Sequence, residues 1–348
     1  MMHKKFIVIG VTLSLIIVGV WFFRQQTTIS EIKQEIVGAT KQVAEEIIAE
    51  VNPLSIEALR KTETPGSELT IEKILSPGSN YKRYIASYKS EGLKIYGLLS
   101  IPNTKKPVGG FPAIIFNHGY IPPTQYRTTE KYVSYFDYLA RNGYVIFKPD
   151  YRGHGSSEGD PSGAYGFNGY TIDVLNAFTT IQKHSDVNPQ KIGMWGHSMG
   201  GYITLRCMVV HKDIKVGVIW GGVVASHADM LTHWNRKNSP PPNLPQNARR
   251  WRTALIETFG SPETNKTFWD SLSANSFLKD LSGPIQLHHA DTDKTVPVSF
   301  SQELYEDLQA EQRPSELYIY AGDDHNISKN FSLAMKRSLA YFDKMLKN

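Results

Sequence analysis

One serine stands in a setting that can turn it into a nucleophile. Residues 191–201 read KIGMWGHSMGG, and Ser198 lies at the centre of a G-x-S-x-G pattern. An apolar, strand-like run precedes the pattern and a helix-like run follows it, which predicts a sharp strand-to-helix turn. Glycines two positions to either side let strand and helix approach closely, and the helix dipole favours negative charge near the hydroxyl. The alternative is that Ser198 only caps a helix.

A serine hydroxyl needs a base to become a good nucleophile, and the base needs a carboxylate to orient it. Two later loops supply such groups: the strand-like PIQLHH runs into ADTDKTVP, and ELYIY runs into AGDDHNI. His325 is the candidate base. The first loop holds two candidate acids, Asp291 and Asp293. We favour Asp293, which stands three residues before Val296.

The same reaction needs donors for the negative oxygen of a tetrahedral intermediate. The backbone N–H of Met199, directly after the serine, is one candidate. The second should come from the loop after the strand AIIFNHGY, where Gly119 permits a tight turn and the N–H of Tyr120 can face the oxygen. We expect His118 to hold this loop rather than to act as a base.

The sequence predicts no cofactor and no metal. It contains neither of the two glycine-rich phosphate-binding patterns, and His288 and His289 lack the H-E-x-x-H spacing. Adjacent residues on a strand also point to opposite faces. The glycine-rich turn at 150–155 is expected to shape the wall of the site, and the single cysteine, Cys207, to be buried and inert. The formal charge of +5 without a basic run excludes an electrostatic case for nucleic acid as a partner.

From about Leu69 onward, strand and helix patterns alternate, which predicts an α/β fold: a mostly parallel sheet with helices on both faces. A hairpin with its turn at Glu91-Gly92 adds antiparallel strands. Expected strands are 113–117, 144–149, 191–195, 216–220, 285–289 and 317–320. Expected helices are 130–141, 171–184, 199–212, 298–310 and 332–346.

A long insertion interrupts this alternation at about 223–281. It contains three tryptophans and the run SPPPNLP at 239–245. A segment of this length is rarely a plain loop, and it leaves the sheet where ligand sites of α/β folds lie. We expect a helical cap over the site, with a surface excursion as the alternative.

The first 25 residues form a separate segment. Residues 6–23 read FIVIGVTLSLIIVGVWFF, and 18 residues of helix span roughly 27 Å, close to the hydrocarbon core of a bilayer. Two lysines precede the run, which places the remainder outside the cytoplasm. We therefore expect a single-pass N-terminal membrane anchor in residues 1–25, with a cleaved signal peptide and secretion as the alternative. A helical stalk or linker at 26–68 and a catalytic domain at 69–348 follow.

Together, GHSMGGY, NHGY, DYRGHGSSEG, HHADTDKTVP and GDDHN resemble the α/β-hydrolase superfamily. Within it, residues 81–348 are most similar to the catalytic domain of the prolyl oligopeptidase family, including acylaminoacyl-peptidase-like enzymes and related esterases. The resemblance implies an α/β-hydrolase fold. It implies a nucleophile, an acid, a base and two oxyanion donors at Ser198, Asp293, His325, Tyr120 and Met199.

The sequence departs from that family in two places. About 55 residues separate the apolar run from the similar region, too few for the β-propeller that many members carry. Ala290 also stands where the family pattern has glycine. We expect hydrolysis of an ester or amide through an acyl-enzyme, on a small ester or a short peptide. The alternatives are an acyltransferase and a catalytically inactive, membrane-tethered binding module.

Overall fold

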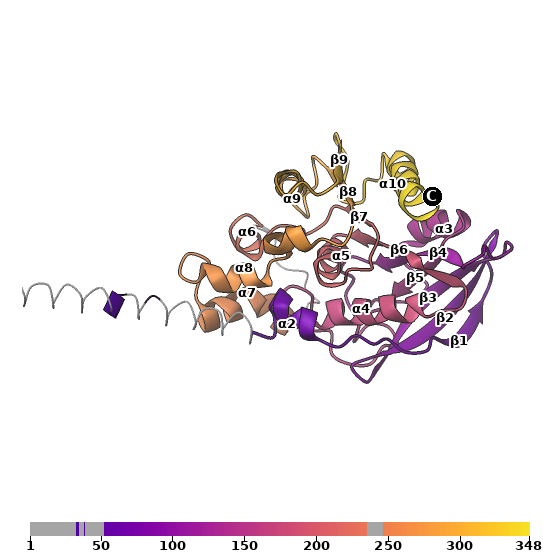
Figure 1. Ribbon diagram of the computed structural model, residues 1–348, viewed down its shortest axis with the longest axis horizontal. Coiled ribbons are helices and arrows are strands. Elements are labelled where there is room, and N and C mark those ends of the chain that lie inside the picture. Colours follow the sequence, from indigo (N-terminus) through magenta and orange to yellow (C-terminus); the bar gives the residue numbers. More distant parts are fainter. Residues whose placement is uncertain (1–32, 35–37, 39–51, 235–245) are drawn as a thin grey trace, which may run out of the picture. The chain divides into compact units, whose positions relative to one another are not determined.

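The computed structural model describes residues 33–34, 38, 52–234 and 246–348 (Figure 1). The chain divides into two units, 1–51 and 52–348. The expected membrane anchor or signal peptide lies outside the described residues, as does most of the helical pattern that follows it. Among the residues that are described, no helix is long and apolar enough to cross a bilayer.

The strands of the described residues form one sheet in the order β1-β2-β3-β5-β4-β6-β7-β8-β9 (Figure 1). All strand regions expected from the sequence are present, with ends that differ by a few residues. Their bounds are β1 Thr70–Leu75, β2 Tyr81–Ser90, β3 Leu93–Pro102, β4 Phe111–Asn117, β5 Val145–Pro149, β6 Val187–His197, β7 Gly217–Trp220, β8 Ile285–Ala290 and β9 Ser315–Tyr320.

Strands β4 to β9 pair in parallel, whereas β1, β2 and β3 pair antiparallel at one edge. Burial follows this division, because helices cover both faces of a parallel sheet. Every residue of β4, β5, β7 and β8 is buried, but the edge strand β1 is exposed along most of its length. The β2–β3 hairpin turns at Glu91 and Gly92, both with positive φ, as the sequence predicts.

The order in which the chain adds strands to the sheet reverses at β4. The chain goes from β4 to β5 on one side, then returns to place β6 on the other side of β4. Ligands of open α/β sheets bind at the carboxyl ends of strands beside such a reversal. The segment after β4 reaches Gly119 and the segment after β6 begins with Ser198, so both meet at this point.

Helices cover the two faces of the sheet. One apolar cluster contains residues of α4, α5 and α9, and a second contains residues of α3 and α10, which lie together in Figure 1. The expected helices are all present. The bounds are α2 Ile56–Lys61, α3 Val133–Arg141, α4 Gly169–Gln182, α5 Met199–Val210, α6 His227–Thr232, α7 Gln246–Phe259, α8 Lys266–Leu272, η1 Ala274–Asp280 (a 3₁₀ segment), α9 Ser299–Ala310 and α10 Phe331–Leu346.

The insertion between β7 and β8 is helical in its described part and consists of α6, α7, α8 and η1. Phe259 and Phe268 stack with ring centroids 4.1 Å apart and join α7 to α8. Trp234 donates from Nε1 to the Thr295 carbonyl at 2.8 Å. Because Thr295 lies two residues after Asp293, this bond fixes the insertion to the loop of the candidate acid.

The end of the segment expected as a stalk or linker, before β1, packs on the catalytic unit. Its part from Asn52 onward belongs to the second unit, and α2 packs against α5. Arg206 on α5 is buried and donates to the carbonyls of Leu54 and Leu272 and to Asn168 Oδ1. These hydrogen bonds satisfy a buried charge and join the segment, the insertion and α4 to one helix.

We predict that the fold loses stability in mild acid. Burial lowers the pKa of seven of the described histidines below the usual value of about 6.5, so the unfolded chain binds protons that the folded chain does not. Five of them are almost fully buried, His118, His154, His197, His227 and His288, and the last three have pKa values of about 3. Below about pH 6.5, each of these histidines lowers the free energy of unfolding by up to about 1.4 kcal/mol per pH unit.

Two buried carboxyls oppose this trend. Burial raises the pKa of Asp150 to about 6 and also raises that of Asp173, so the folded chain takes up protons there as the pH falls and offsets part of the histidine effect. Urea unfolding at pH 7, 6 and 5 measures the sum, which should decrease steeply. A free energy of unfolding that is constant across this range would contradict the prediction.

Candidate active site

Ser198 occupies a strained turn between β6 and α5. Its φ and ψ are 54° and −117°, in a region that costs a non-glycine residue energy and recurs at functional sites. A Cβ on Gly196 would lie 2.4 Å from the Gly200 carbonyl oxygen, and one on Gly200 would lie 1.9 Å from the Asn117 carbonyl oxygen. Only glycine therefore fits at these positions, as the G-x-S-x-G pattern predicts.

The loops after β8 and β9 place a carboxylate and an imidazole in contact. His325 Nδ1 lies 2.6 Å from Asp293 Oδ2. Asp291, the other candidate acid, instead accepts the Gly322 N–H at 2.7 Å and so closes the turn after β9. Of the two carboxylates in the loop, the structure thus brings Asp293 to the candidate base.

Asp293 is held from several directions. Its Oδ1 accepts the N–H groups of Thr295 and Val296 at 2.7 and 3.0 Å, and its Oδ2 also lies 3.2 Å from His289 Nε2. Burial alone would raise the pKa of this carboxyl, but the hydrogen bonds from His289 and His325 outweigh it and lower the pKa. Asp293 therefore stays ionised at neutral pH and favours the tautomer of His325 that carries its proton on Nδ1.

The imidazole of His325 lies beside the residue that precedes the nucleophile. The backbone carbonyl oxygen of His325 is 3.0 Å from Nε2 of this residue, His197, and the two imidazole rings have centroids 4.6 Å apart. Gly221 closes the other side, since a Cβ there would be 3.1 Å from His325 Nδ1. Within the described part of the chain, Ser198 Oγ makes no hydrogen bond to His325. Such bonds are often long in the absence of substrate and shorten when it binds.

The loop after β4 lies against the nucleophile. A Cβ on Gly119 would be 3.2 Å from Ser198 Cβ, and the Gly119 N–H donates to Tyr132 Oη at 2.9 Å. Tyr120, whose N–H is the second donor expected from the sequence, is the next residue of this loop. Met199 begins α5, where the first N–H groups have no acceptor within the helix.

Behind this loop, the glycine-rich turn at 150–155 supports His118. The Tyr151 hydroxyl donates to the His118 carbonyl at 3.0 Å, and the two rings stack with centroids 4.2 Å apart. Arg152 pairs with the buried Asp173 at 2.7 Å and anchors the turn to α4. His118 thus holds the loop, the role expected from the sequence. Cys207 is buried, also as expected, and burial raises the pKa of its thiol.

Three residues near the site were not singled out from the sequence as parts of it. Tyr132 and His197 are in hydrogen-bond contact at 2.7 Å although 65 positions separate them, and His289 contacts the acid. His197 could have been suspected from its place beside Ser198. No sequence signal points to Tyr132, because its contact with the site is purely tertiary.

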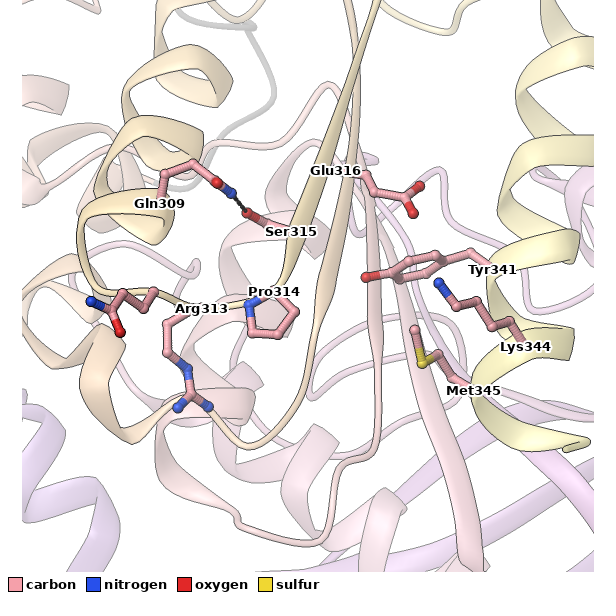
Figure 2. Close-up of a pocket in the computed structure, with 9 residues that line it drawn as sticks. Gln309, Arg313, Pro314, Ser315, Glu316, Tyr341, Lys344 and Met345 are labelled. Atoms are coloured by element: carbon pink, nitrogen blue, oxygen red, sulfur yellow. Dashed lines mark hydrogen bonds between the residues drawn. The ribbon is translucent and has the colours of Figure 1, made fainter.

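A hollow lies away from these residues, at the amino end of β9. It has a volume of about 450 Å³ and is formed where β9 begins and α10 ends, with Arg313, Glu316, Tyr341 and Lys344 in its lining (Figure 2). None of the candidate catalytic residues lines it. They follow the carboxyl ends of their strands, whereas this hollow lies at the amino end, so we do not assign it to the reaction.

Comparison with known proteins places the chain in a family context. The model of the prolyl oligopeptidase family matches residues 131–348. The uncharacterized peptidase YtmA of Bacillus subtilis (strain 168) is 26% identical over 252 residues, which cover 72% of this chain and 88% of the relative. Lysophosphatidylserine lipase ABHD12 of Danio rerio is 27% identical over 209 residues, covering 58% of this chain and 48% of that protein. The chain thus spans about half the length of this lipase.

Solved structures share the fold. The acetyl xylan esterase of Paenibacillus sp. R4 superposes with a TM-score of 0.63 at 16% identity, covering 82% of this chain and 92% of the esterase. The acylaminoacyl peptidase of Pyrococcus horikoshii has a TM-score of 0.62 at 21% identity, covering 78% of this chain and 43% of the peptidase. At these identities the likeness establishes an α/β-hydrolase-like fold.

The two carboxylates after β8 give a matched pair of variants. We predict that Asp293→Asn lowers kcat on an activated ester by about 10³ to 10⁴, because the amide no longer favours the required tautomer of His325. Asp291→Asn, in the same loop, should change kcat by less than about tenfold. Steady-state kinetics on both variants measure the difference, and the reverse order would assign the acid to Asp291.

Proposed function

The chain belongs to the prolyl oligopeptidase family and is a serine hydrolase, and we propose that it cleaves carboxylic esters with Ser198, Asp293 and His325 as its triad. The observation that carries the assignment is the 2.6 Å contact of His325 Nδ1 with Asp293, at the sheet edge where Ser198 occupies its strained turn. This contact supports an activated serine, with its base and acid on the neighbouring loops after β9 and β8.

In this proposal Ser198 Oγ attacks the ester carbonyl while His325 Nε2 takes the hydroxyl proton. The N–H groups of Tyr120 and Met199 donate to the oxyanion of the tetrahedral intermediate. As the intermediate collapses, the bond to the leaving oxygen breaks, and His325 gives its proton to the departing alcohol. Water then repeats the sequence on the acyl-enzyme and releases the acid.

A cluster of aromatic rings between α5 and the insertion supports an apolar acyl group. Tyr202 lies one turn along α5 from Ser198, and Tyr165 packs on it with ring centroids 5.0 Å apart. Tyr165 also contacts Trp234 at 5.5 Å and Trp251 at 6.0 Å. These rings extend from the nucleophile helix to the loop of Asp293, through the Trp234 bond to Thr295. Tyr202, Trp234 and Trp251 are themselves buried and give this side of the catalytic loops an apolar interior, which favours an apolar ligand.

The comparisons support the same choice. A lipase and an esterase are among the similar proteins, and both names denote enzymes that cleave esters. A short peptide is the second candidate substrate, because YtmA, of which this chain covers 88%, is called a peptidase. Both reactions use the same acyl-enzyme, so the leaving group distinguishes them.

A paired substrate panel tests the choice. We expect p-nitrophenyl esters of two to eight carbons to be hydrolysed with kcat/KM at least about 100-fold above that of aminoacyl and dipeptidyl p-nitroanilides, with an optimum at an intermediate chain length. Ser198→Ala is the control and should be inactive on both series. Hydrolysis of peptidyl anilides at rates that match or exceed the esters would establish the peptidase instead.

We also propose that residues 6–23 anchor the enzyme in a membrane with its catalytic unit outside the cytoplasm. The support comes from the sequence: an uncharged apolar run long enough to span, preceded by two lysines and lacking a small-x-small cleavage site.

Membrane fractionation tests this proposal. The full-length chain should sediment with membranes, resist extraction by carbonate at high pH and dissolve in detergent. Deletion of residues 1–25 should release the enzyme with its esterase activity intact. Recovery of the full-length chain in the supernatant without detergent, or of a shortened mature chain, would favour a cleaved signal peptide.

A further inference from the structure

Tyr132 and His197 join three loops of the site. The Tyr132 hydroxyl lies 2.9 Å from the Gly119 nitrogen and 2.7 Å from His197 Nδ1. The other nitrogen of His197, Nε2, lies 3.0 Å from the His325 carbonyl oxygen. A continuous hydrogen-bonded path thus runs from the oxyanion loop, past the residue before Ser198, to the loop of the base.

The groups at the two ends of this path, the His325 carbonyl and the Gly119 N–H, determine which group donates in every hydrogen bond between them. The His325 carbonyl can only accept, so His197 Nε2 must carry a proton. Burial, together with the charge of His325, lowers the pKa of His197 to about 3, so the ring is neutral at physiological pH. Its Nδ1 is therefore an acceptor, and the Tyr132 O–H must donate to it. The Gly119 N–H then donates to the remaining lone pair of Tyr132.

Packing leaves these groups little room to move. A Cβ on Gly119 would lie 2.6 Å from Tyr132 Oη and 3.1 Å from His197 Nδ1. The Tyr132 ring packs edge-on against Phe116 and Trp195, with centroids 5.7 and 6.1 Å away. Its backbone is left-handed, with φ of 55°, a conformation that a bulky residue adopts only when its surroundings enforce it. The hydroxyl is thus held between the two loops rather than turned toward solvent.

We propose that Tyr132 and His197 are positioning residues that fix the oxyanion loop and the base loop relative to Ser198. The inference rests on the proposed function, because it assigns the path a role in that reaction. Neither side chain need touch the substrate. Tyr132 holds the Gly119 peptide, whose neighbour Tyr120 donates to the oxyanion, and His197 holds the backbone of His325. Both loops are then preorganised before substrate binds.

The Tyr132→Phe variant tests the path at its centre. It keeps the ring in its packing site but removes the hydroxyl, which leaves the Gly119 N–H and His197 Nδ1 without their partner. We expect kcat on the best ester to fall by about 10- to 100-fold, with KM changed by less than about threefold, because the lost geometry matters in the transition state.

Tyr144→Phe is the matched control. Its hydroxyl donates to Asp343 Oδ1 at 2.7 Å in the same apolar cluster, between β5 and α10 and far from the triad loops. Both variants lose one hydrogen bond of a tyrosine, so their midpoints of thermal unfolding should decrease by similar amounts. Only Tyr132→Phe should lose kcat. Equal kcat for the two variants and wild type would overturn the proposal.

Two substitutions of His197 separate its two hydrogen bonds. Gln at this position can place a donor where Nε2 stands and keep the bond to the His325 carbonyl, whereas Asn can reach only the place of Nδ1. We therefore expect His197→Gln to retain at least about tenfold more kcat than His197→Asn. The reverse order would show that the contact with Tyr132, rather than the hold on His325, is what matters.

A readout independent of turnover separates this inference from the proposed function. In the full-length chain labelled with ¹⁵N-histidine, NMR should report His197 as the neutral tautomer with its proton on Nε2 between pH 5 and 8. In Tyr132→Phe the resonance should shift toward a mixture of tautomers. A charged ring, or a proton on Nδ1 in wild type, would refute the path whatever the activity. A wild type with this tautomer that turns over no ester or amide would refute the proposed function alone.

Discussion

The tight turn at Ser198 is the constraint on which the rest of the site depends. Strand β6 and helix α5 approach so closely there that glycine alone fits at 196 and 200. The strain at Ser198 is sustained by bonds on both sides of the turn: its N–H donates to the Trp220 carbonyl, and its own carbonyl accepts from Val223. Because both partners lie at or just after the end of β7, the turn is fixed to the strand beside which His325 lies.

The site is surrounded by buried polar groups whose protonation is set by their surroundings. Burial keeps His118 and His197 neutral, so each presents one donor and one acceptor in a fixed arrangement. Asp293, by contrast, stays charged because two imidazoles and two backbone N–H groups stabilise its carboxylate. The same balance between desolvation and hydrogen bonding explains both kinds of group. It gives neutral histidines that orient loops and one ionised carboxylate that orients the base.

Much of the fold could be predicted from the sequence because its central strands are buried on both faces. Runs such as AIIF at 113–116 and YVIF at 144–147 are apolar throughout, which is typical of a parallel sheet. Element ends were less predictable. Helix α3 begins at Val133 rather than at 130, because Tyr132 is left-handed. Strand β6 extends back to Val187, which pairs with Phe111 of β4 across a register shift. The six-residue helix α2 is too short to give a clear periodic pattern.

The loops that carry the candidate site residues could be located by their order after successive strands. Asp291 and Asp293 stand two positions apart in one loop, and the sequence favoured Asp293 only by its spacing from Val296. In the structure each carboxylate has a different partner. Contacts such as Tyr132 with His197, or Trp234 with Thr295, could not be foreseen, since they depend on how separate elements pack. Sequence patterns thus located groups that lie on loops next to strands, but not the side chains that hold those loops together.

Covalent labelling of the nucleophile tests the central claim most directly. The folded chain is treated with a fluorophosphonate, digested, and the adduct is located by mass spectrometry. An activated serine in a strained turn should react stoichiometrically at Ser198, and Ser198→Ala should take up no label while keeping the circular dichroism spectrum of the wild type. A folded wild type that forms no adduct, or that forms it at a different serine, would contradict the account.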